Sequence, residues 1–197
     1  MEGAEEAKRQ REQLDLYLKW VEEEGGIDGP TRIDTMVQPA QVVRMEWLKA
    51  HSVGTILEGG CNWGIVLAWC QGQAGFDKNK ANIELAQILA PKRRFYVGDA
   101  RKLPIEDGAF DTVMLPDILE HILWEDVPKA LKEARRVARQ KVLITVPDAD
   151  TAMGQIFRHA WLATPEKVKA IRDCFRRDNF IVERNQGFIL MEVSINV

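Results

Sequence analysis

The chain has 197 residues, of which 46% are apolar and 29% charged, and its formal net charge is −3. These values are typical of a soluble protein with one sizeable core, and they give no general attraction to nucleic acid or anionic membranes. The three cysteines form no CxxC pair, which argues against a disulfide framework and a structural zinc site. Since no apolar run reaches membrane-spanning length and the N-terminus lacks a signal-peptide pattern, we expect a cytoplasmic protein without a membrane partner.

The predicted elements begin with two helices. Residues 1–24 carry apolar side chains at helical spacing, Tyr17 and Trp20 among them, and a second helix is predicted from Pro39 to Ala50. From Val53 onward strands alternate with helices, which is typical of βαβ units and a parallel sheet. Strands are predicted near residues 53–58, 74–77, 94–98, 110–115 and 141–146, and helices near 64–71, 79–90, 126–139 and 165–178.

The end of the chain departs from this alternation. Two strand-like runs, 180–183 and 188–197, are separated by a short connection that contains Gly187. A connection this short joins antiparallel neighbours. We therefore expect an α/β fold, a Rossmann-like doubly wound sheet that is mostly parallel and ends in an antiparallel hairpin. The whole chain, 1–197, is expected to be one domain, with an N-terminal helical cap over 1–50 and a core over 51–197.

The stretch from Glu58 to Gly64 carries the strongest functional signal. An apolar run ends in Glu58, a glycine-rich turn follows, and a helical pattern begins at Ile65. Glycine lets a ligand approach the backbone, and the helix N-terminus adds free N–H groups. Asp77 ends the next short apolar run, about 20 residues further on, where an acidic side chain suits the paired hydroxyls of a ribose. This arrangement predicts a cofactor with a nucleoside part.

Five elements follow one another at suitable spacing: the Glu58–Gly64 turn, Asp77, Gly98-Asp99-Ala100, Phe110-Asp111 with Leu119-Glu120-His121, and the terminal hairpin. Together they resemble the class I S-adenosylmethionine-dependent methyltransferases, of the small-molecule, type 11-like branch. The resemblance implies the seven-stranded methyltransferase fold, S-adenosyl-L-methionine as cofactor and S-adenosyl-L-homocysteine as product. The residues that it implies at the cofactor are Glu58, Gly60, Cys61, Asn62, Asp77, Lys78, Asp99, Ala100 and Leu115.

Some of these residues have simpler interpretations. Glu58 would accept from the cofactor's amino group or only hold the turn through backbone N–H groups. Asp99 would accept from the adenine amine or only cap the turn that follows it. Asn62 replaces a glycine of the family pattern, but asparagine tolerates the left-handed conformation. Trp63 is bulky for its position and would narrow the site or stack on a ligand.

A dinucleotide-binding protein is the main rival for such a turn. Its fingerprint needs a second glycine where this chain has Cys61, because the backbone must approach a pyrophosphate there. The terminal hairpin also favours the methyltransferase topology. The segment after the fourth strand, Leu115-Pro116-Asp117-Ile118, lacks the Asn/Asp-Pro-Pro-aromatic motif of enzymes that methylate base amines in nucleic acids.

His121 is the candidate catalytic base, because it follows the fourth strand and histidine titrates in the useful range. The other interpretation is that it only packs or shapes the pocket. His159 and Trp161, in the long connection 147–164, are weaker candidates for acceptor contact. The three histidines lie far apart in sequence, without the short spacings of metal sites, so we expect no metal.

The sequence therefore predicts transfer of a methyl group to an O or N atom of a small-molecule acceptor, by a monomer or homodimer. A nucleic-acid partner is not expected. The basic cluster between Lys129 and Lys141 is read as a solvated helix face rather than an RNA-binding stripe. Two alternatives stay open: a catalytically inactive methyltransferase-fold protein that serves as a binding or scaffold partner, and an RNA or protein methyltransferase.

Overall fold

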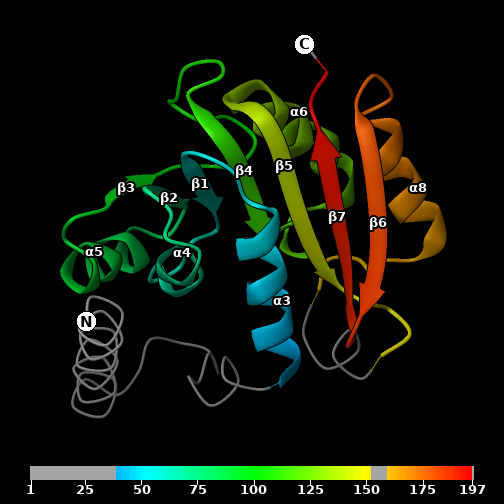
Figure 1. Cartoon of the computed structure of the whole chain (residues 1–197), viewed down its shortest axis with the longest axis horizontal. Helices are drawn as coiled ribbons and strands as arrows, with labels where there is room; N and C mark the ends of the chain where they lie inside the picture. Colours follow the sequence, from blue (N-terminus) through cyan, green and yellow to red (C-terminus); the bar gives the residue numbers. More distant parts are fainter. Residues whose placement is uncertain (1–38, 152–158, 197) are drawn as a thin grey trace. The chain divides into compact units, whose positions relative to one another are not determined.

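Seven strands form one mixed sheet in the order β3-β2-β1-β4-β5-β7-β6 (Figure 1). The computed structural model describes residues 39–151 and 159–196, so the helix expected over 1–24, with Tyr17 and Trp20, lies outside the described residues. The strands are β1 (Ile56–Gly59), β2 (Ala74–Asp77), β3 (Arg94–Val97), β4 (Phe110–Pro116), β5 (Ala138–Pro147), β6 (Asn179–Asn185) and β7 (Phe188–Ser194). The sequence-based prediction of a mostly parallel α/β sheet is confirmed.

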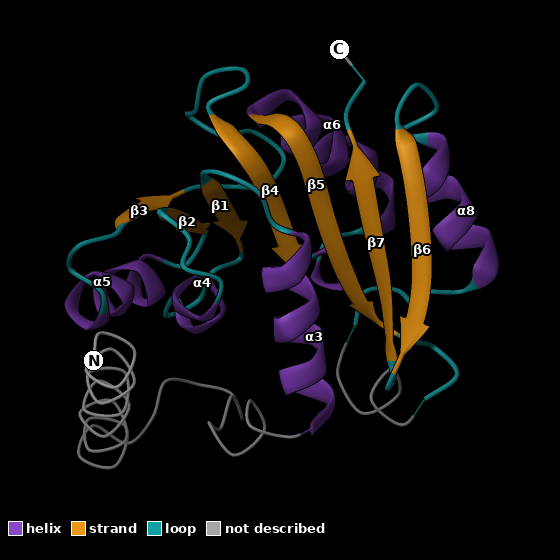
Figure 2. Ribbon diagram, in the orientation of Figure 1, coloured by secondary structure: helices purple, strands orange, loops and turns teal. Residues whose placement is uncertain are grey.

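Helices cover both faces of this sheet. Figure 2 shows α3 in front of the strands and α6 and α8 behind them. The α-helices are α3 (Pro39–His51), α4 (Ile65–Trp69), α5 (Lys80–Leu89), α6 (Val127–Val137) and α8 (Pro165–Asp173), and two 3-10 turns are η1 (Leu119–His121) and η2 (Trp124–Asp126). None of the described helices is long and apolar enough to cross a membrane.

The antiparallel end of the sheet follows from a two-residue turn. Gln186 and Gly187 have φ angles of 45° and 91°, the left-handed conformation that the favoured hairpin turns require. The turn pairs β6 with β7, and β7 in turn pairs with β5, so that Ile144 lies opposite Met191. The predicted hairpin is confirmed, and it gives the otherwise parallel sheet its antiparallel strands.

Several boundaries differ from the prediction by a few residues; α8, for example, ends at Asp173 rather than near residue 178. The helical pattern suggested a helix as far as residue 139, but α6 ends at Val137 and β5 already begins at Ala138. Ala138 pairs with Phe110 at the start of β4, and the side chains of Arg139 and Gln140 both donate to the Asp111 carboxylate. Pairing with a neighbouring strand and these side-chain bonds outweigh the local helical preference.

The apolar face of α6 packs into the core as its periodicity predicts. Val127, Ala130, Leu131, Ala134 and Val137 are all buried. They belong to one cluster with strand side chains such as Val113 and Ile144 and with Ile171 and Phe175 from the α8 region. Burial of this apolar stripe, rather than helix propensity alone, holds α6 on the sheet.

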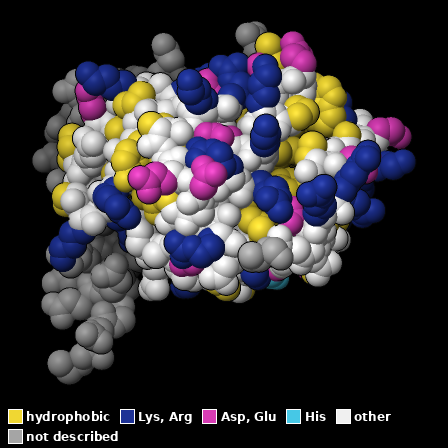
Figure 3. Space-filling view, turned by 90° about the horizontal axis from the view of Figure 1, so that it is seen from above, with side chains coloured by type: hydrophobic (Ala, Val, Ile, Leu, Met, Phe, Trp, Pro, Cys, Tyr) yellow, Lys and Arg dark blue, Asp and Glu magenta, His cyan; other side chains and the backbone are white. Residues whose placement is uncertain are grey.

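The basic cluster on and after α6 is largely neutralised by carboxylates. Ion pairs join Lys129 to Asp126, Arg135 to Asp178, Arg136 to Asp107 and Glu133, Arg139 to Asp111, and Lys141 to Glu192. Figure 3, which views the molecule from above, shows lysine and arginine side chains interspersed with acidic and apolar ones. The pairing fits a solvated surface.

We expect Leu131→Ala to lower the free energy of unfolding by about 2–5 kcal/mol, because Leu131 is fully buried and its truncation leaves a cavity under α6. Lys132→Ala, on the exposed side of the same helix, should change it by less than about 0.5 kcal/mol. Urea denaturation followed by circular dichroism measures both values. Equal effects of the two variants would contradict this account of α6.

Candidate functional site

The turn after β1 has an unusual backbone. Gly60, Asn62 and Gly64 adopt φ angles of 63°, 48° and 80°, all in the left-handed region. Glycine reaches this region without strain, and asparagine reaches it more easily than most other residues. The Gly64 N–H donates to the Cys61 carbonyl at 2.7 Å, which closes the turn just before α4. Asn62 therefore fits a position where the family pattern has glycine.

Asp77 holds this turn against the end of β2. One of its carboxylate oxygens accepts from the Asn62 N–H at 3.0 Å, and the other accepts from the Asn79 N–H at 2.8 Å. The Cys61 N–H donates to the Phe76 carbonyl at 3.0 Å. Each carboxylate oxygen can accept a further hydrogen bond, because it has two lone pairs. These hydrogen bonds thus link the turn at the carboxyl end of β1 to the carboxyl end of β2.

Two buried polar atoms near this turn have no hydrogen-bond partner among the described residues: Oε2 of Glu58 and Oδ1 of Asn62. Glu58 is 2% exposed, and this burial raises the pKa of its carboxyl to about 8, against the opposing effects of the Arg44 guanidinium and the Leu67 N–H. Buried polar atoms without partners are rare in proteins. These two are suited to accept hydrogen bonds from a ligand that carries N–H or O–H groups.

Three other predicted residues at this end of the sheet are buried. Cys61 and Leu115 lie in the core, and a Cβ added to Gly59 would come within 2.6 Å of a Leu115 methyl group. Burial and the nearby Glu58 and Asp77 carboxylates raise the pKa of the Cys61 thiol. Trp63 is only 9% exposed, so most of its indole is covered by protein.

Asp99 follows β3 and is held by Arg101. Its carboxylate accepts from the Arg101 backbone N–H at 2.9 Å, from Nε at 2.9 Å and from Nη2 at 2.5 Å. These bonds lower the pKa of Asp99 to about 2. The bond from the Arg101 backbone N–H caps the turn that follows Asp99. Ala100, next to it, is buried, and Lys78 is exposed.

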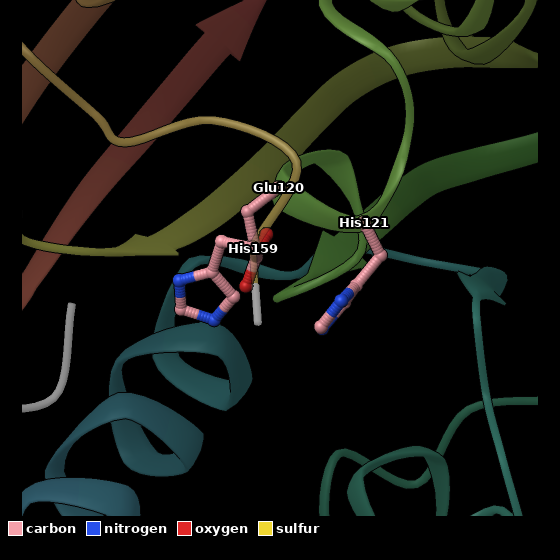
Figure 4. Close-up of side chains that lie close together, drawn as sticks. All are labelled: Glu120, His121 and His159. Atoms are coloured by element: carbon pink, nitrogen blue, oxygen red, sulfur yellow. The ribbon is translucent and has the colours of Figure 1, made fainter. Parts of the chain in front are cut away.

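A second group of polar side chains gathers beyond β4. Ring centroids of His121 and His159 lie 5.4 Å apart in an edge-to-face arrangement. One potential ligand atom from each of Glu120, His121 and His159 lies within 4.8 Å of the other two. Figure 4 shows the two imidazole rings on either side of the Glu120 carboxylate. His121 and His159, although far apart in the sequence, thus lie side by side.

The segment that carries His159 is fixed to η1 by hydrogen bonds. The Ala160 N–H donates to the Glu120 carbonyl at 2.8 Å. The indole N–H of Trp161 is shared between the carbonyls of Leu119 at 2.9 Å and Ile122 at 3.1 Å. Trp161, a weaker candidate for acceptor contact, is 5% exposed and anchors this segment.

Burial and neighbouring charges favour the uncharged forms of Glu120 and His121. Glu120 is 2% exposed, and burial together with the neighbouring Asp117 raises the pKa of its carboxyl well above the usual value. Burial and the nearby His159 lower the pKa of His121, although Asp117 opposes this effect. A neutral imidazole has one nitrogen with a free lone pair, so it can accept a proton or bind a cation.

Arg44, which is buried, forms an ion pair with the partly exposed Asp117, and no sequence pattern indicated this pair. Arg44, on α3, is 4% exposed and donates to Oδ2 of Asp117 at 2.6 Å, while Thr145 on β5 donates to Oδ1 at 2.7 Å. Asp117 has a φ angle of 51°, and its position directly after β4 was the available signal. His51 lies elsewhere, stacked on Trp47 with ring centroids 4.3 Å apart.

Comparison with known proteins agrees with this geometry. Residues 57–146 match the family model described as a methyltransferase domain. Over 56 residues, the chain is 45% identical to norajmaline N-methyltransferase of Rauvolfia serpentina; this stretch is 28% of this chain and 18% of that protein. The chain thus spans less than a fifth of the length of that curated relative.

Two of the solved structures that share the fold illustrate the likeness. One is a SAM-dependent methyltransferase of Thermotoga maritima, a possible histamine N-methyltransferase, with a TM-score of 0.70 and 15% identity over 94% of this chain and 97% of that chain. The other is magnesium protoporphyrin IX methyltransferase of Synechocystis with bound SAH, with a TM-score of 0.64 and 13% identity over 93% of this chain and 100% of that chain. At these identities the likeness shows the fold alone.

The buried Glu58 carboxyl should make stability depend on pH. Folded Glu58 keeps its proton up to about pH 8, whereas the unfolded chain releases it near 4.5. Between these values unfolding releases a proton, so the free energy of unfolding falls by about 1.4 kcal/mol per pH unit from this group alone. We expect Glu58→Gln, which cannot ionise, to be more stable relative to wild type at pH 8 than at pH 5.

Denaturation in urea at both pH values measures this difference. Glu84→Gln is the matched control, because the Glu84 side chain is 59% exposed on α5. Its stability should follow that of wild type across the pH range. Parallel curves for Glu58→Gln and wild type would show that Glu58 carries no raised pKa in the folded protein.

Proposed function

We propose that this chain, which through residues 57–146 belongs to the type 11 branch of class I S-adenosylmethionine-dependent methyltransferases, transfers a methyl group to an O or N atom of a small-molecule acceptor. The observation that carries the proposal is the turn after β1. It combines three left-handed residues with the Asp77 hydrogen bonds and the unpartnered Glu58 oxygen. S-adenosylmethionine, when bound, supplies an electrophilic methyl group on a sulfonium.

The residues of the turn would hold the methionine and ribose parts. Gly60 packs against Ile118, and only glycine fits here, since an added Cβ would come within 2.8 Å of the Ile118 side chain. The unpartnered oxygens of Glu58 and Asn62 would accept hydrogen bonds from the cofactor, and Cys61 would contribute its backbone. Asp77 would accept from two ribose hydroxyls while keeping its bonds to the turn.

The adenine part would lie along the ends of β3 and β4. Asp99 would accept from the exocyclic amine beside its Arg101 contacts, and the Ala100 N–H would bind the ring. Lys78 is close enough to lower the pKa of Asp99, so its stem would flank the adenosine. Leu115 would present its backbone to the methionine part. A fixed arrangement of this kind can contribute roughly 7–11 kcal/mol to methyl transfer through proximity alone.

His121 would accept the proton of the acceptor. It follows β4 at the same sheet edge as the Gly60 turn, and Ile118, three residues before it, packs beside Gly60. A general base is needed only for an acceptor that holds a proton at neutral pH. The neighbouring His159 keeps the ring in place through edge-to-face contact.

Two observations support a small-molecule acceptor. Norajmaline N-methyltransferase, which is 45% identical over 56 residues, is named for a small-molecule acceptor. In the described part of the chain, most members of the basic cluster on α6 are paired with carboxylates, which leaves little free positive charge for nucleic acid. We also propose a cytoplasmic monomer or homodimer, in line with three cysteines that form no disulfide.

The alternatives predict different binding. An inactive scaffold protein would bind neither S-adenosylmethionine nor S-adenosylhomocysteine. An RNA or protein methyltransferase would bind a macromolecule, and binding to RNA would weaken steeply as salt is raised.

Calorimetry should detect binding of S-adenosylmethionine and S-adenosylhomocysteine to the purified chain. We expect Asp77→Ala to weaken binding at least tenfold, because it removes the ribose acceptor and releases the Asn62 N–H. Asp107→Ala, at an exposed ion pair with Arg136, should bind as wild type does. Absence of binding to folded wild-type protein would exclude the enzyme proposal.

Once an acceptor is found by screening metabolite pools, His121→Ala should lower kcat by about 10²–10⁴-fold and leave cofactor affinity unchanged. His51→Ala, which removes a histidine stacked on Trp47, should keep full turnover. Full turnover of His121→Ala would exclude the base role.

A further inference from the structure

We propose that Glu120, His121 and His159 bind a divalent transition-metal cation on the acceptor side of the site. Each residue can offer one ligand atom, and these atoms lie within 4.8 Å of one another (Figure 4). Metal–ligand bonds of about 2.0–2.2 Å place the atoms of a tetrahedral ligand set roughly 3.3–3.6 Å apart. Movements of up to about an ångström would therefore bring all three atoms onto one ion.

The burial of Glu120 is the second, independent observation. Its side chain is 2% exposed, and neither carboxylate oxygen has a hydrogen-bond partner among the described residues. An isolated buried carboxylate is costly unless it is paired or coordinates a metal. Both oxygens are therefore available to a ligand, and a cation would supply the missing partner.

The neighbouring charges do not supply that partner. Arg44 is the nearest buried cation, but its Nη1 donates to Asp117, whose other oxygen accepts from Thr145. Arg44 and Asp117 thus largely neutralise each other, and Glu120 is left without a charged partner among the described residues. A divalent cation would pair with the Glu120 carboxylate and compensate its desolvation.

The ligands lie on two segments that are fixed to each other. Glu120 and His121 belong to η1, while His159 is held by the Ala160 N–H bond to the Glu120 carbonyl. Trp161 adds two hydrogen bonds to the same segment. A site whose ligands are held in place by the surrounding hydrogen bonds loses little conformational entropy when an ion binds.

The donor set indicates the class of metal. Two imidazole nitrogens and one carboxylate suit Zn²⁺, Mn²⁺, Fe²⁺ or Co²⁺, whereas Mg²⁺ and Ca²⁺ prefer oxygen ligands. Three protein ligands also leave coordination positions open for water or an acceptor oxygen. This proposal differs from the sequence-based expectation of no metal, which considered only short spacings along the chain.

The inference depends on the proposed function in one respect, because only the proposed function places the cation site beside the cofactor. In the cation-bound protein, the ligating nitrogen of His121 holds the metal and cannot also take a proton. His121 then acts as a base only in the cation-free protein. A chelator would therefore alter the cation-bound protein and leave the cation-free protein unchanged.

Titration of EDTA-treated protein with CoCl₂ tests the site, with visible absorption of Co²⁺ and calorimetry as readouts. We expect one equivalent to bind with d–d absorption bands characteristic of nitrogen and oxygen ligands. Glu120→Gln and His159→Gln should each weaken binding by about tenfold or more. His51→Ala and Cys174→Ser, which alter a remote histidine and an exposed thiol, should bind as wild type does.

Absence of stoichiometric binding to wild type would overturn the inference, and so would unchanged binding in both ligand variants. Thermal unfolding checks that the variants are folded and should show that Co²⁺ raises the Tm of wild type but not of Glu120→Gln. Cofactor binding is measured separately on EDTA-treated protein. Cation binding without cofactor binding would refute the proposed function alone, and the reverse result would refute only the metal site.

Discussion

The carboxylate of Asp77 connects the two parts of the chain on which the rest of the site depends. It receives the N–H of Asn62 from the turn after β1 and the N–H of Asn79 from the start of α5. Without this bridge, three left-handed residues in five positions would have many accessible conformations. The bridge selects one of them, and it does so at the sheet edge where neighbouring parallel strands end.

The periodicity of apolar residues and the turn residues predict the sheet, but they do not predict the group formed by Glu120, His121 and His159. The parallel strands, the α6 stripe and the hairpin at Gly187 follow from local patterns of apolar residues and turn residues. The contact between His121 and His159 depends on the path of a long connection, which is set by the hydrogen bonds of Ala160 and Trp161. Contacts of this kind cannot be inferred from the spacing of residues along the sequence.

Within the candidate cofactor site, the sequence predicted backbone conformation and burial better than it predicted ion pairs. Asn62 takes the left-handed conformation that its position requires, and Glu58 is buried at the end of β1. The ion pair of Asp99 with Arg101 was not foreseen, because either residue alone is compatible with many surface roles. Most of Trp63 is covered by protein, although its neighbours in the sequence are small or polar.

The cysteines divide into two chemical classes because of where the fold places them. Burial raises the pKa of the Cys61 thiol, and it raises that of Cys70 to about 12, so neither forms an appreciable amount of thiolate at neutral pH. Cys174, just after α8, is exposed. A maleimide-linked spectroscopic probe would therefore attach at one defined position in the native protein, on the opposite face of the sheet from α3, without any engineered substitution.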